Sequence, residues 1–200
     1  MIVPAVTVLV SGSGTTLQAI LDAIRLGELS CRVNCVISDR PGAFALERAR
    51  AAGIPAVVVD RRTHPTREDL SSEVSRKIPP ETALVVLAGY LSIVTEPLLG
   101  RFNRRMINIH PALLPDFGGP GMYGDNVHRA VLAAGVRRTG CTVHYVDAGT
   151  DTGEIILHRR IPVLPGDTPE TLRERLRPVE HKAIVTALEM ALAAAEGVDR

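Results

Sequence analysis

The sequence predicts an α/β protein built on a mostly parallel, twisted sheet with helices on both faces. In the first half of the chain, short apolar runs alternate with segments of helical periodicity, as in consecutive βαβ units. A glycine-rich loop follows the first apolar run, which is typical of a Rossmann-like half. Near the C-terminus, two β-rich runs are joined by a connector too short for a crossover helix, so we expect that pair to be antiparallel.

The elements of the first half follow from periodicity and from the flanking residues. Strands are expected at 6–10, 32–37, 56–59, 84–88 and 106–109. Helices are expected at 17–24, 44–52 and 67–76, with a short one after Thr95. Gly53 is suited to close the second helix, and Thr66 to cap the third. Strands and helices at this spacing imply right-handed crossovers.

The second half of the chain changes character. Positions 116–125 hold five Gly or Pro residues and are expected to form a loop. A helix is expected at 127–134, followed by the two β-rich runs at 141–146 and 155–163. Thr168 should cap the final helical stretch, which Pro178 is expected to divide into two helices.

Composition argues against several classes of function. The 200 residues carry 23 Lys and Arg against 22 Asp and Glu, so the net charge of +1 supplies no field to attract nucleic acid or an acidic membrane. Aromatic residues make up 3% with no Trp, which argues against stacking surfaces for single-stranded nucleic acid. No apolar run is long enough to cross a bilayer. We therefore expect neither a nucleic-acid nor a membrane partner.

The cysteines and the N-terminal residues favour a reducing cellular compartment. An odd count of three, Cys31, Cys35 and Cys141, makes no disulfide framework and favours a reducing environment. Cys31 and Cys35 are expected to share a buried strand face rather than to bind a metal. The first residues lack the basic segment and long apolar stretch of a signal peptide. We expect a cytoplasmic location.

The loop Ser-Gly-Ser-Gly-Thr-Thr at 11–16 joins the first strand to the first helix. Free N–H groups at a helix start attract an anion, and the glycines allow close approach. Leu17 stands where a dinucleotide motif needs its third glycine, and the Gly-Lys-Ser/Thr of a triphosphate loop is absent. The loop favours a single phosphate. The alternative is a turn that only closes the βα unit.

Two polar residues alternate with apolar ones at the end of the fifth strand. A period of two places Asn108 and His110 on one face, where the carboxyl ends of parallel strands meet a binding crevice. An amide donor beside an imidazole suits acyl transfer to an amine, since one stabilises an oxyanion and the other moves protons. The alternative is a structural histidine. A carboxylate from Asp151 or Asp147 could orient the imidazole, and spacing does not choose between them.

A family resemblance runs through nearly the whole chain. Its motifs are Val-Leu-Val-Ser-Gly-Ser-Gly at 8–14, Leu-Gln-Ala-Ile at 17–20, Ile-Ser-Asp-Arg at 37–40, Ala-Leu-Glu-Arg-Ala at 45–49, Val-Leu-Ala-Gly-Tyr at 86–90, Asn-Ile-His-Pro-Ala-Leu-Leu-Pro at 108–115, Gly-Cys-Thr-Val-His-Tyr-Val at 140–146 and Glu-His at 180–181. In these stretches the chain resembles the phosphoribosylglycinamide formyltransferases, the folate-dependent transformylases of purine synthesis.

The resemblance implies an activity. The formyl group of 10-formyltetrahydrofolate, the co-substrate, would pass to the amine of 5'-phosphoribosylglycinamide in de novo purine synthesis. It also implies the formyltransferase fold, small-molecule partners and no metal. We expect one domain, 1–200, with a mononucleotide- and phosphate-binding half, 1–105, and a catalytic and folate-binding half, 106–200. The sequence leaves a homodimer open.

The same resemblance assigns site residues. It places the oxyanion stabiliser on Asn108, the proton shuttle on His110 and the carboxylate that raises the basicity of His110 on Asp151. Contacts to the phosphate and the ribonucleotide fall on Gly14, Thr15, Thr16 and Glu180. Contacts to the folate fall on Arg67, Leu91, Ser92, Ile93, Val94 and Asn108.

Three features depart from the usual family pattern. Thr16 stands where many members have Asn, so a hydroxyl replaces an amide. Ser92 stands where the folate run commonly has Arg, which removes a charged contact. The loop 118–124 is longer than in some relatives, and we expect it to cover the site as a flexible flap. His144 either faces the site beside Thr142 or is structural.

Several other functions are alternatives to the transferase. Formyltetrahydrofolate hydrolases carry an extra N-terminal domain and methionyl-tRNA formyltransferases an extra C-terminal one, so on length we expect the 200 residues to be neither. A nicotinamide oxidoreductase would use Asp39 as ribose ligand, but the missing third glycine argues against it. A non-catalytic binding module is the remaining alternative.

Overall fold

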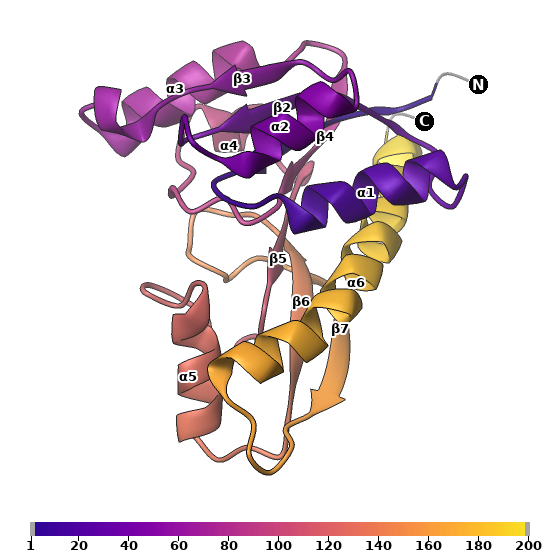
Figure 1. Ribbon diagram of the computed structural model, residues 1–200. Coiled ribbons are helices and arrows are strands. Elements are labelled where there is room, and N and C mark those ends of the chain that lie inside the picture. The colour runs from indigo at the N-terminus through magenta and orange to yellow at the C-terminus, as the bar shows by residue number, and fades with distance from the viewer. Residues whose placement is uncertain (1–2, 199–200) are drawn as a thin grey trace.

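Seven strands and six α-helices make up the computed structural model, which describes residues 3–198. The strands are β1 (Ala5–Val10), β2 (Arg32–Ser38), β3 (Ala56–Val58), β4 (Thr82–Leu87), β5 (Met106–His110), β6 (Arg138–Tyr145) and β7 (Ile155–Pro162). The helices are α1 (Thr15–Arg25), α2 (Phe44–Ala51), α3 (Arg67–Lys77), α4 (Leu98–Arg101), α5 (Asp125–Ala133) and α6 (Pro169–Val198), with a 3-10 turn at Arg61–Thr63. Figure 1 shows their arrangement.

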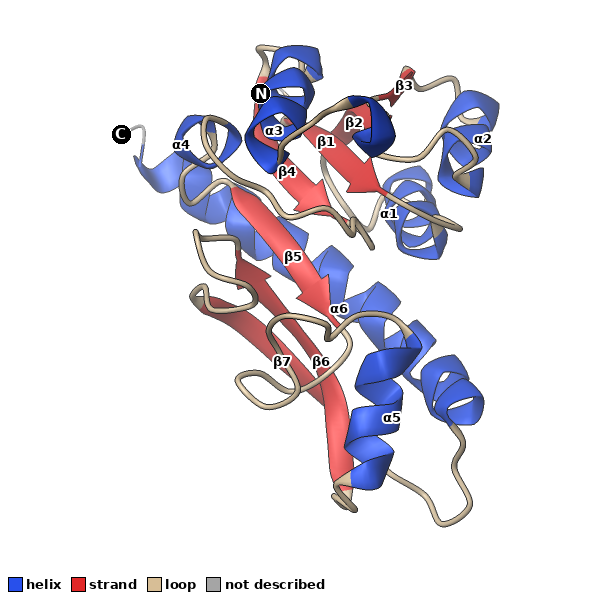
Figure 2. Cartoon of the chain, turned by 90° about the vertical axis from the view of Figure 1, so that its left-hand side faces the viewer, coloured by secondary structure: helices blue, strands red, loops and turns tan. Residues whose placement is uncertain are grey.

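All seven strands belong to one sheet, in the order β3-β2-β1-β4-β5-β6-β7. The pairings from β3 across to β5 are parallel. Those of β5 with β6 and of β6 with β7 are antiparallel. In Figure 2, β5 lies between the parallel part of the sheet and the β6–β7 pair. The expected fold class is therefore confirmed, including the antiparallel pair near the C-terminus.

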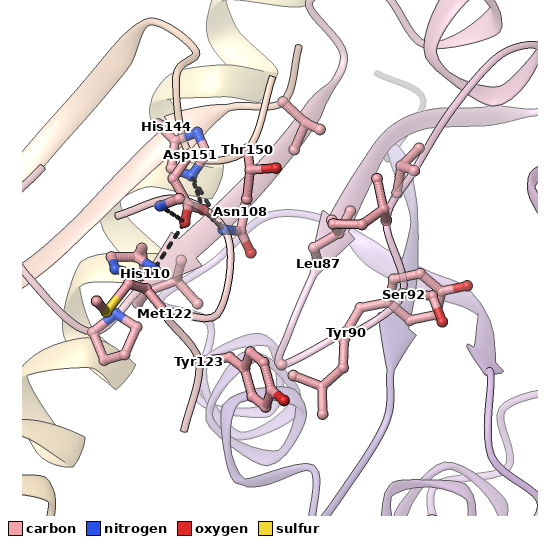
Figure 3. Close-up of a pocket in the computed structure, with 18 of the residues that line it drawn as sticks. Leu87, Tyr90, Ser92, Asn108, His110, Met122, Tyr123, His144, Thr150 and Asp151 are labelled. Carbon is pink, nitrogen blue, oxygen red and sulfur yellow. Dashed lines mark hydrogen bonds and ion pairs between the residues drawn. The ribbon is translucent and has the colours of Figure 1, made fainter. Parts of the chain in front are cut away.

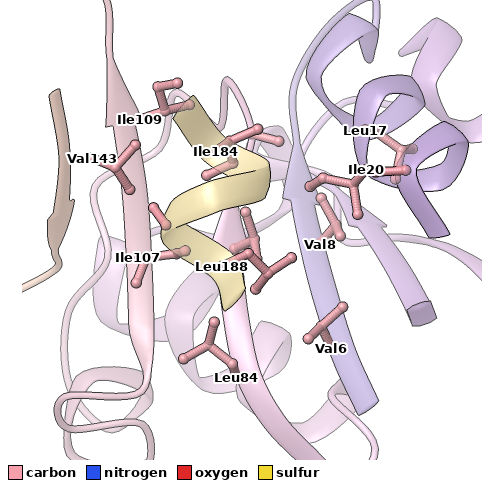
Figure 4. Close-up of a cluster of buried hydrophobic side chains, with 14 of the residues drawn as sticks. Val6, Val8, Leu17, Ile20, Leu84, Ile107, Ile109, Val143, Ile184 and Leu188 are labelled. Carbon is pink, nitrogen blue, oxygen red and sulfur yellow. The ribbon is translucent and has the colours of Figure 1, made fainter. Parts of the chain in front are cut away.

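Helices cover both faces of the sheet, as expected. On one face, α1 and α6 pack on alternate residues of the strands, and Figure 4 shows Ile184 and Leu188 of α6 between side chains of β1 and β5. On the other face, Leu70 and Val74 of α3 and Leu98 of α4 join a second buried cluster. A third, smaller cluster lies beneath α5. Burial of apolar area on both faces accounts for the near-continuous apolar runs of the parallel strands.

A bulge in β2 changes which side chains share a face. The β1–β2 register shifts after Val6, whose partner is Val33, because Thr7 pairs with Cys35 and Asn34 is an extra residue. Cys35 therefore packs on the α3 face, whereas Cys31 belongs to the cluster under α1 and α6. The expectation that both cysteines share one face is wrong, since one extra residue inverts the alternation.

Helix α6 is continuous, so the expected division at Pro178 is also wrong. Its N-terminus is capped by Thr168, whose Oγ1 accepts an N–H from the first turn at 3.3 Å. Proline removes one intrahelical hydrogen bond. Leu176 before Pro178 and Ile184 after it are both fully buried in the same core cluster. Tertiary packing on both sides of the proline therefore maintains the helix.

Thr66 caps α3 as expected, because its side chain accepts the N–H of Asp69. Within residues 3–198, no helix combines the length and the apolar character that crossing a membrane requires. The remaining elements begin and end close to the expected positions. The strand order reverses between β1 and β4, so the carboxyl ends of the parallel strands open onto a common edge.

Candidate active site

A cleft of about 520 Å³ opens at the carboxyl ends of β4 and β5. Its walls come from the segment after β4, the loop after β5 and the connector between β6 and β7. In Figure 3, Tyr90 and Ser92 lie on one side of the cleft, and Asn108, His110 and Asp151 lie on the other. Ligands of open α/β sheets bind at this edge, which makes the cleft the candidate active site.

Strand β5 presents its two polar side chains to the cleft. Ile107 and Ile109 point the other way, into the core under α6, so Asn108 and His110 share the opposite face, as predicted. His110 is 3% exposed. The alternation that the sequence shows thus places an amide and an imidazole side by side at the floor of the cleft.

Asp151 approaches this pair from the β6–β7 connector, where its φ of 59° turns the chain. Its Oδ2 lies 3.5 Å from Nδ1 of His110 and accepts the backbone N–H of Gly119 at 3.0 Å. Its Oδ1 lies 3.5 Å from Nδ2 of Asn108. Asp147 instead accepts N–H and O–H groups within its own turn. The structure therefore brings Asp151, and not Asp147, to the imidazole.

The second ring nitrogen of His110 is also engaged. Nε2 lies 2.8 Å from the carbonyl oxygen of Phe117, where it can only donate a proton. Burial lowers the pKa of His110 below 6.5, although the Asp151 charge and the Phe117 carbonyl act in the opposite direction. Burial acts to raise the pKa of Asp151, but the histidine contacts and the Gly119 N–H outweigh it and lower that pKa. The site therefore favours a carboxylate beside a neutral imidazole near pH 7.

His144 joins the same cluster, which resolves the alternative left open by the sequence. Antiparallel pairing of β5 and β6 sets it opposite Asn108. Its Nε2 lies 3.1 Å from Nδ2 of Asn108 and 3.6 Å from Oδ1 of Asp151, and its Nδ1 lies 2.8 Å from the Tyr145 carbonyl. A proton on Nδ1 leaves Nε2 as an acceptor, which orients the Asn108 amide. In the sequence, the position of His144 two residues after Thr142, on the same strand face, was the signal that it faces the site.

The glycine loop meets the cleft only in part. Thr16 lines the cleft, whereas Gly14 and Thr15 do not. Gly14 precedes α1 with a φ of 71°, and a Cβ there would lie 2.6 Å from Cβ of Ala45. Close packing against α2 and a left-handed backbone therefore both require glycine at this position. A phosphate contact by Gly14 and Thr15 stays a prediction.

Of the six residues predicted to bind folate, Asn108 belongs to the polar cluster, and the other five line the cleft outside that cluster. These five are Arg67, Leu91, Ser92, Ile93 and Val94. Leu91 and Ile93 are 38% and 37% exposed, which is high for large apolar side chains next to a cavity. The Ser92 hydroxyl donates to Oδ2 of Asp39 at 2.6 Å, so it bonds to the protein behind the wall. Arg67 is the one arginine or lysine among the described residues of the cleft.

Glu180 reaches the cleft from α6 and is half-buried. Burial raises its pKa to about 7, against the opposing charge of Arg177. Met122 and Tyr123 of the loop 118–124 also line the cleft, and Tyr123 is 56% exposed. In the part of the chain that the structure describes, no group of three His, Cys, Asp or Glu residues could hold a metal ion.

Comparison with known proteins identifies the family. The family described as formyl transferase matches residues 5–188. A crystal structure of glycinamide ribonucleotide transformylase 1 from Symbiobacterium toebii is 45% identical, with a TM-score of 0.89 over 97% of this chain and 88% of that one. The trifunctional purine biosynthetic protein adenosine-3 of Drosophila pseudoobscura pseudoobscura is 43% identical over 188 residues.

Coverage differs between these relatives. The match takes in 92% of this chain but only 13% of the trifunctional protein, so the chain spans about an eighth of that relative. A formyltetrahydrofolate deformylase from Pseudomonas syringae is 28% identical, with a TM-score of 0.85 over 96% of this chain and 62% of that one. The family match extends over more than nine-tenths of the sequence and includes every strand and the whole polar cluster. The chain therefore belongs to the formyl transferase family.

Proposed function

We propose that this chain transfers the formyl group of 10-formyltetrahydrofolate to the amine of 5'-phosphoribosylglycinamide. The family implies a folate co-substrate, and the most similar of the solved structures described above is named for glycinamide ribonucleotide. The observation that carries the proposal is the contact of His110 with Asp151 beside Asn108. Together they offer a proton carrier and an amide donor at one point of a cleft.

The opposite wall suits the folate. Leu91, Ile93 and Val94 offer apolar surface to a flat ring system, and Arg67 offers a cation to a carboxylate tail. Bound there, the folate supplies the formyl group and the nitrogen that leaves it. The ribonucleotide would place its phosphate at the start of α1, near Gly14, Thr15 and Thr16, where helix N–H groups favour an anion. Glu180 would bind the glycinamide end.

The polar cluster would carry out the transfer. Asn108 donates one N–H to the formyl oxygen as negative charge develops there, in place of its long 3.5 Å contact with Asp151, while its other N–H stays on Nε2 of His144. His110 accepts the proton that the attacking amine loses and returns it to the folate nitrogen as the carbon–nitrogen bond breaks. Asp151 stabilises the positive charge that His110 carries between these two steps.

Residues 1–200 would act as one catalytic unit, since both halves contribute residues to the cleft. Three free cysteines, all buried, support a reducing compartment such as the cytoplasm. Fractionation of cells that express a tagged chain would test that location. Light scattering of the purified protein would distinguish a monomer from the homodimer that the sequence leaves open.

Hydrolysis of formyltetrahydrofolate is the second candidate, because the similar deformylase shares this fold. One experiment separates the two. Purified protein is incubated with 10-formyltetrahydrofolate, with and without glycinamide ribonucleotide, and release of the deformylated folate is followed by absorbance. Release that requires the ribonucleotide supports the transferase. Equal release without it identifies a hydrolase, and no release by folded protein rejects both.

A further inference from the structure

The segment 91–95 lies after β4, and its residues 91–94 line the cleft; it has neither helical nor strand structure. Its conformation therefore depends on attachments to the rest of the fold. The N–H of Leu91 donates to Oγ of Ser11 at 2.8 Å, and the N–H of Thr95 donates to Oγ of Ser71 at 3.0 Å. Between these two ends, the Ser92 hydroxyl donates a hydrogen bond to the Asp39 carboxylate.

Asp39 is held rigidly at the carboxyl end of β2. It follows β2 directly, its side chain is 0% exposed, and it does not line the cleft. Its N–H donates to the carbonyl of Val10 at 3.4 Å, and its own carbonyl accepts the N–H of Arg61 at 3.1 Å. The carboxylate is thus held at a fixed point behind the wall of the cleft.

The hydrogen bond between the two side chains is short. At 2.6 Å, the Ser92 hydroxyl and the Oδ2 of Asp39 are at the distance of a charge-assisted hydrogen bond. Oδ1 has no partner within residues 3–198. Loss of the hydroxyl would leave a buried acceptor unsatisfied, so the segment would move to let water or another donor reach it. The Tyr90 side chain hydrogen-bonds that of Ser92, and burial and the charge of Asp39 raise the pKa of its phenol.

We propose that Asp39 is a positioning residue: through Ser92 it holds the segment 91–95 in the conformation that the formyl donor requires. The proposal rests on the proposed function, because the donor is the folate of that reaction. Ser92 then acts through Asp39 and not by contact with the donor. Leu91 and Ile93, on either side of Ser92, are the side chains that the bond keeps turned toward the cleft.

Steady-state kinetics would test the proposal, after the wild-type protein has been shown to transfer formyl groups. If the wild-type protein transfers none, the proposed function is rejected and the role of Asp39 is not addressed. Ser92→Ala and Asp39→Ala are each expected to raise the donor KM about tenfold, with the ribonucleotide KM unchanged within about twofold. The double variant should match either single variant, since both remove the same bond. Asp39→Asn keeps an acceptor oxygen for the Ser92 hydroxyl, so the donor KM of this variant should equal that of the wild type.

A control variant and a measurement without donor complete the test. Thr186→Ala removes a hydroxyl of α6 that bonds the Lys182 carbonyl and should change neither KM. In the unliganded protein, Ser92→Ala should raise amide hydrogen-exchange rates in the segment 91–95 about tenfold, and Thr186→Ala should not. An unchanged exchange rate, or a donor KM raised by Ser92→Ala but not by folded Asp39→Ala, would overturn the proposal in favour of direct contact.

Discussion

Oδ2 of Asp151 lies 3.5 Å from Nδ1 of His110, and the two side chains are 12% and 4% exposed. Burial disfavours the charged imidazole and the carboxylate favours it, with burial the larger effect on the pKa of His110. The imidazole is therefore neutral in the free protein but can hold a proton during turnover. A group that accepts a proton and then returns it needs this balance.

Asp151→Asn should lower kcat by about 10²- to 10⁴-fold, because the amide no longer stabilises a protonated His110. The amide oxygen can still accept the N–H of Gly119, so the loop after β5 should keep its place. Asp147→Asn is the matched control, since that side chain lies in the same connector and accepts hydrogen bonds from Gly149 and Thr152 instead of contacting the catalytic cluster. Equal losses in both variants would indicate a structural effect of the connector.

The pH dependence of kcat/KM should show an acid limb from His110. Its pKa is lowered from 6.5, so the neutral form persists, and activity with it, until the pH falls through a value below 6.5. Asp151 acts to raise that pKa, and Asp151→Asn should therefore move the limb to still lower pH. pH–rate profiles of the two proteins would measure this. A limb that moves to higher pH would contradict the assignment.

Glu180 should make the protein less stable as the pH rises. Its pKa is raised from 4.5 to about 7 in the folded state, so its favourable contribution is complete below 4.5 and is lost as the pH rises through 7. Glu180→Gln should therefore gain about 2 kcal/mol in unfolding free energy relative to wild type between pH 5 and 8. Denaturant titrations across this range would measure it. Glu189→Gln, at an exposed position of α6, should show no such trend.

Pro178→Ala should increase the unfolding free energy by about 1–3 kcal/mol. Pro178 is exposed and lies inside a continuous helix, where it lacks one N–H donor. Alanine restores that donor and removes no buried side chain. Thermal or denaturant unfolding would measure the change. A loss of stability would show that the proline ring makes a contact that α6 needs.

The sequence by itself determined the succession of strands and helices along the chain, because periodicity and capping are properties of neighbouring residues. It also placed Asn108 and His110 on one face, since their separation within β5 leaves no other choice for a regular strand. The assignment of Leu91 and Ile93 to the folate wall came instead from the resemblance of contiguous sequence motifs to the formyltransferase family. These features involve residues close together in the chain.

Tertiary structure decided the rest, because it depends on residues far apart in the chain. Packing on both sides of Pro178 kept α6 whole, and a bulge at Asn34 moved Cys35 to the opposite face from Cys31. Strand pairing set His144 against Asn108. Ser92 and Asp39 are 53 positions apart, and only folding brings that hydroxyl to that carboxylate. A contact of this kind depends on how the sheet is assembled, which local residue patterns do not encode.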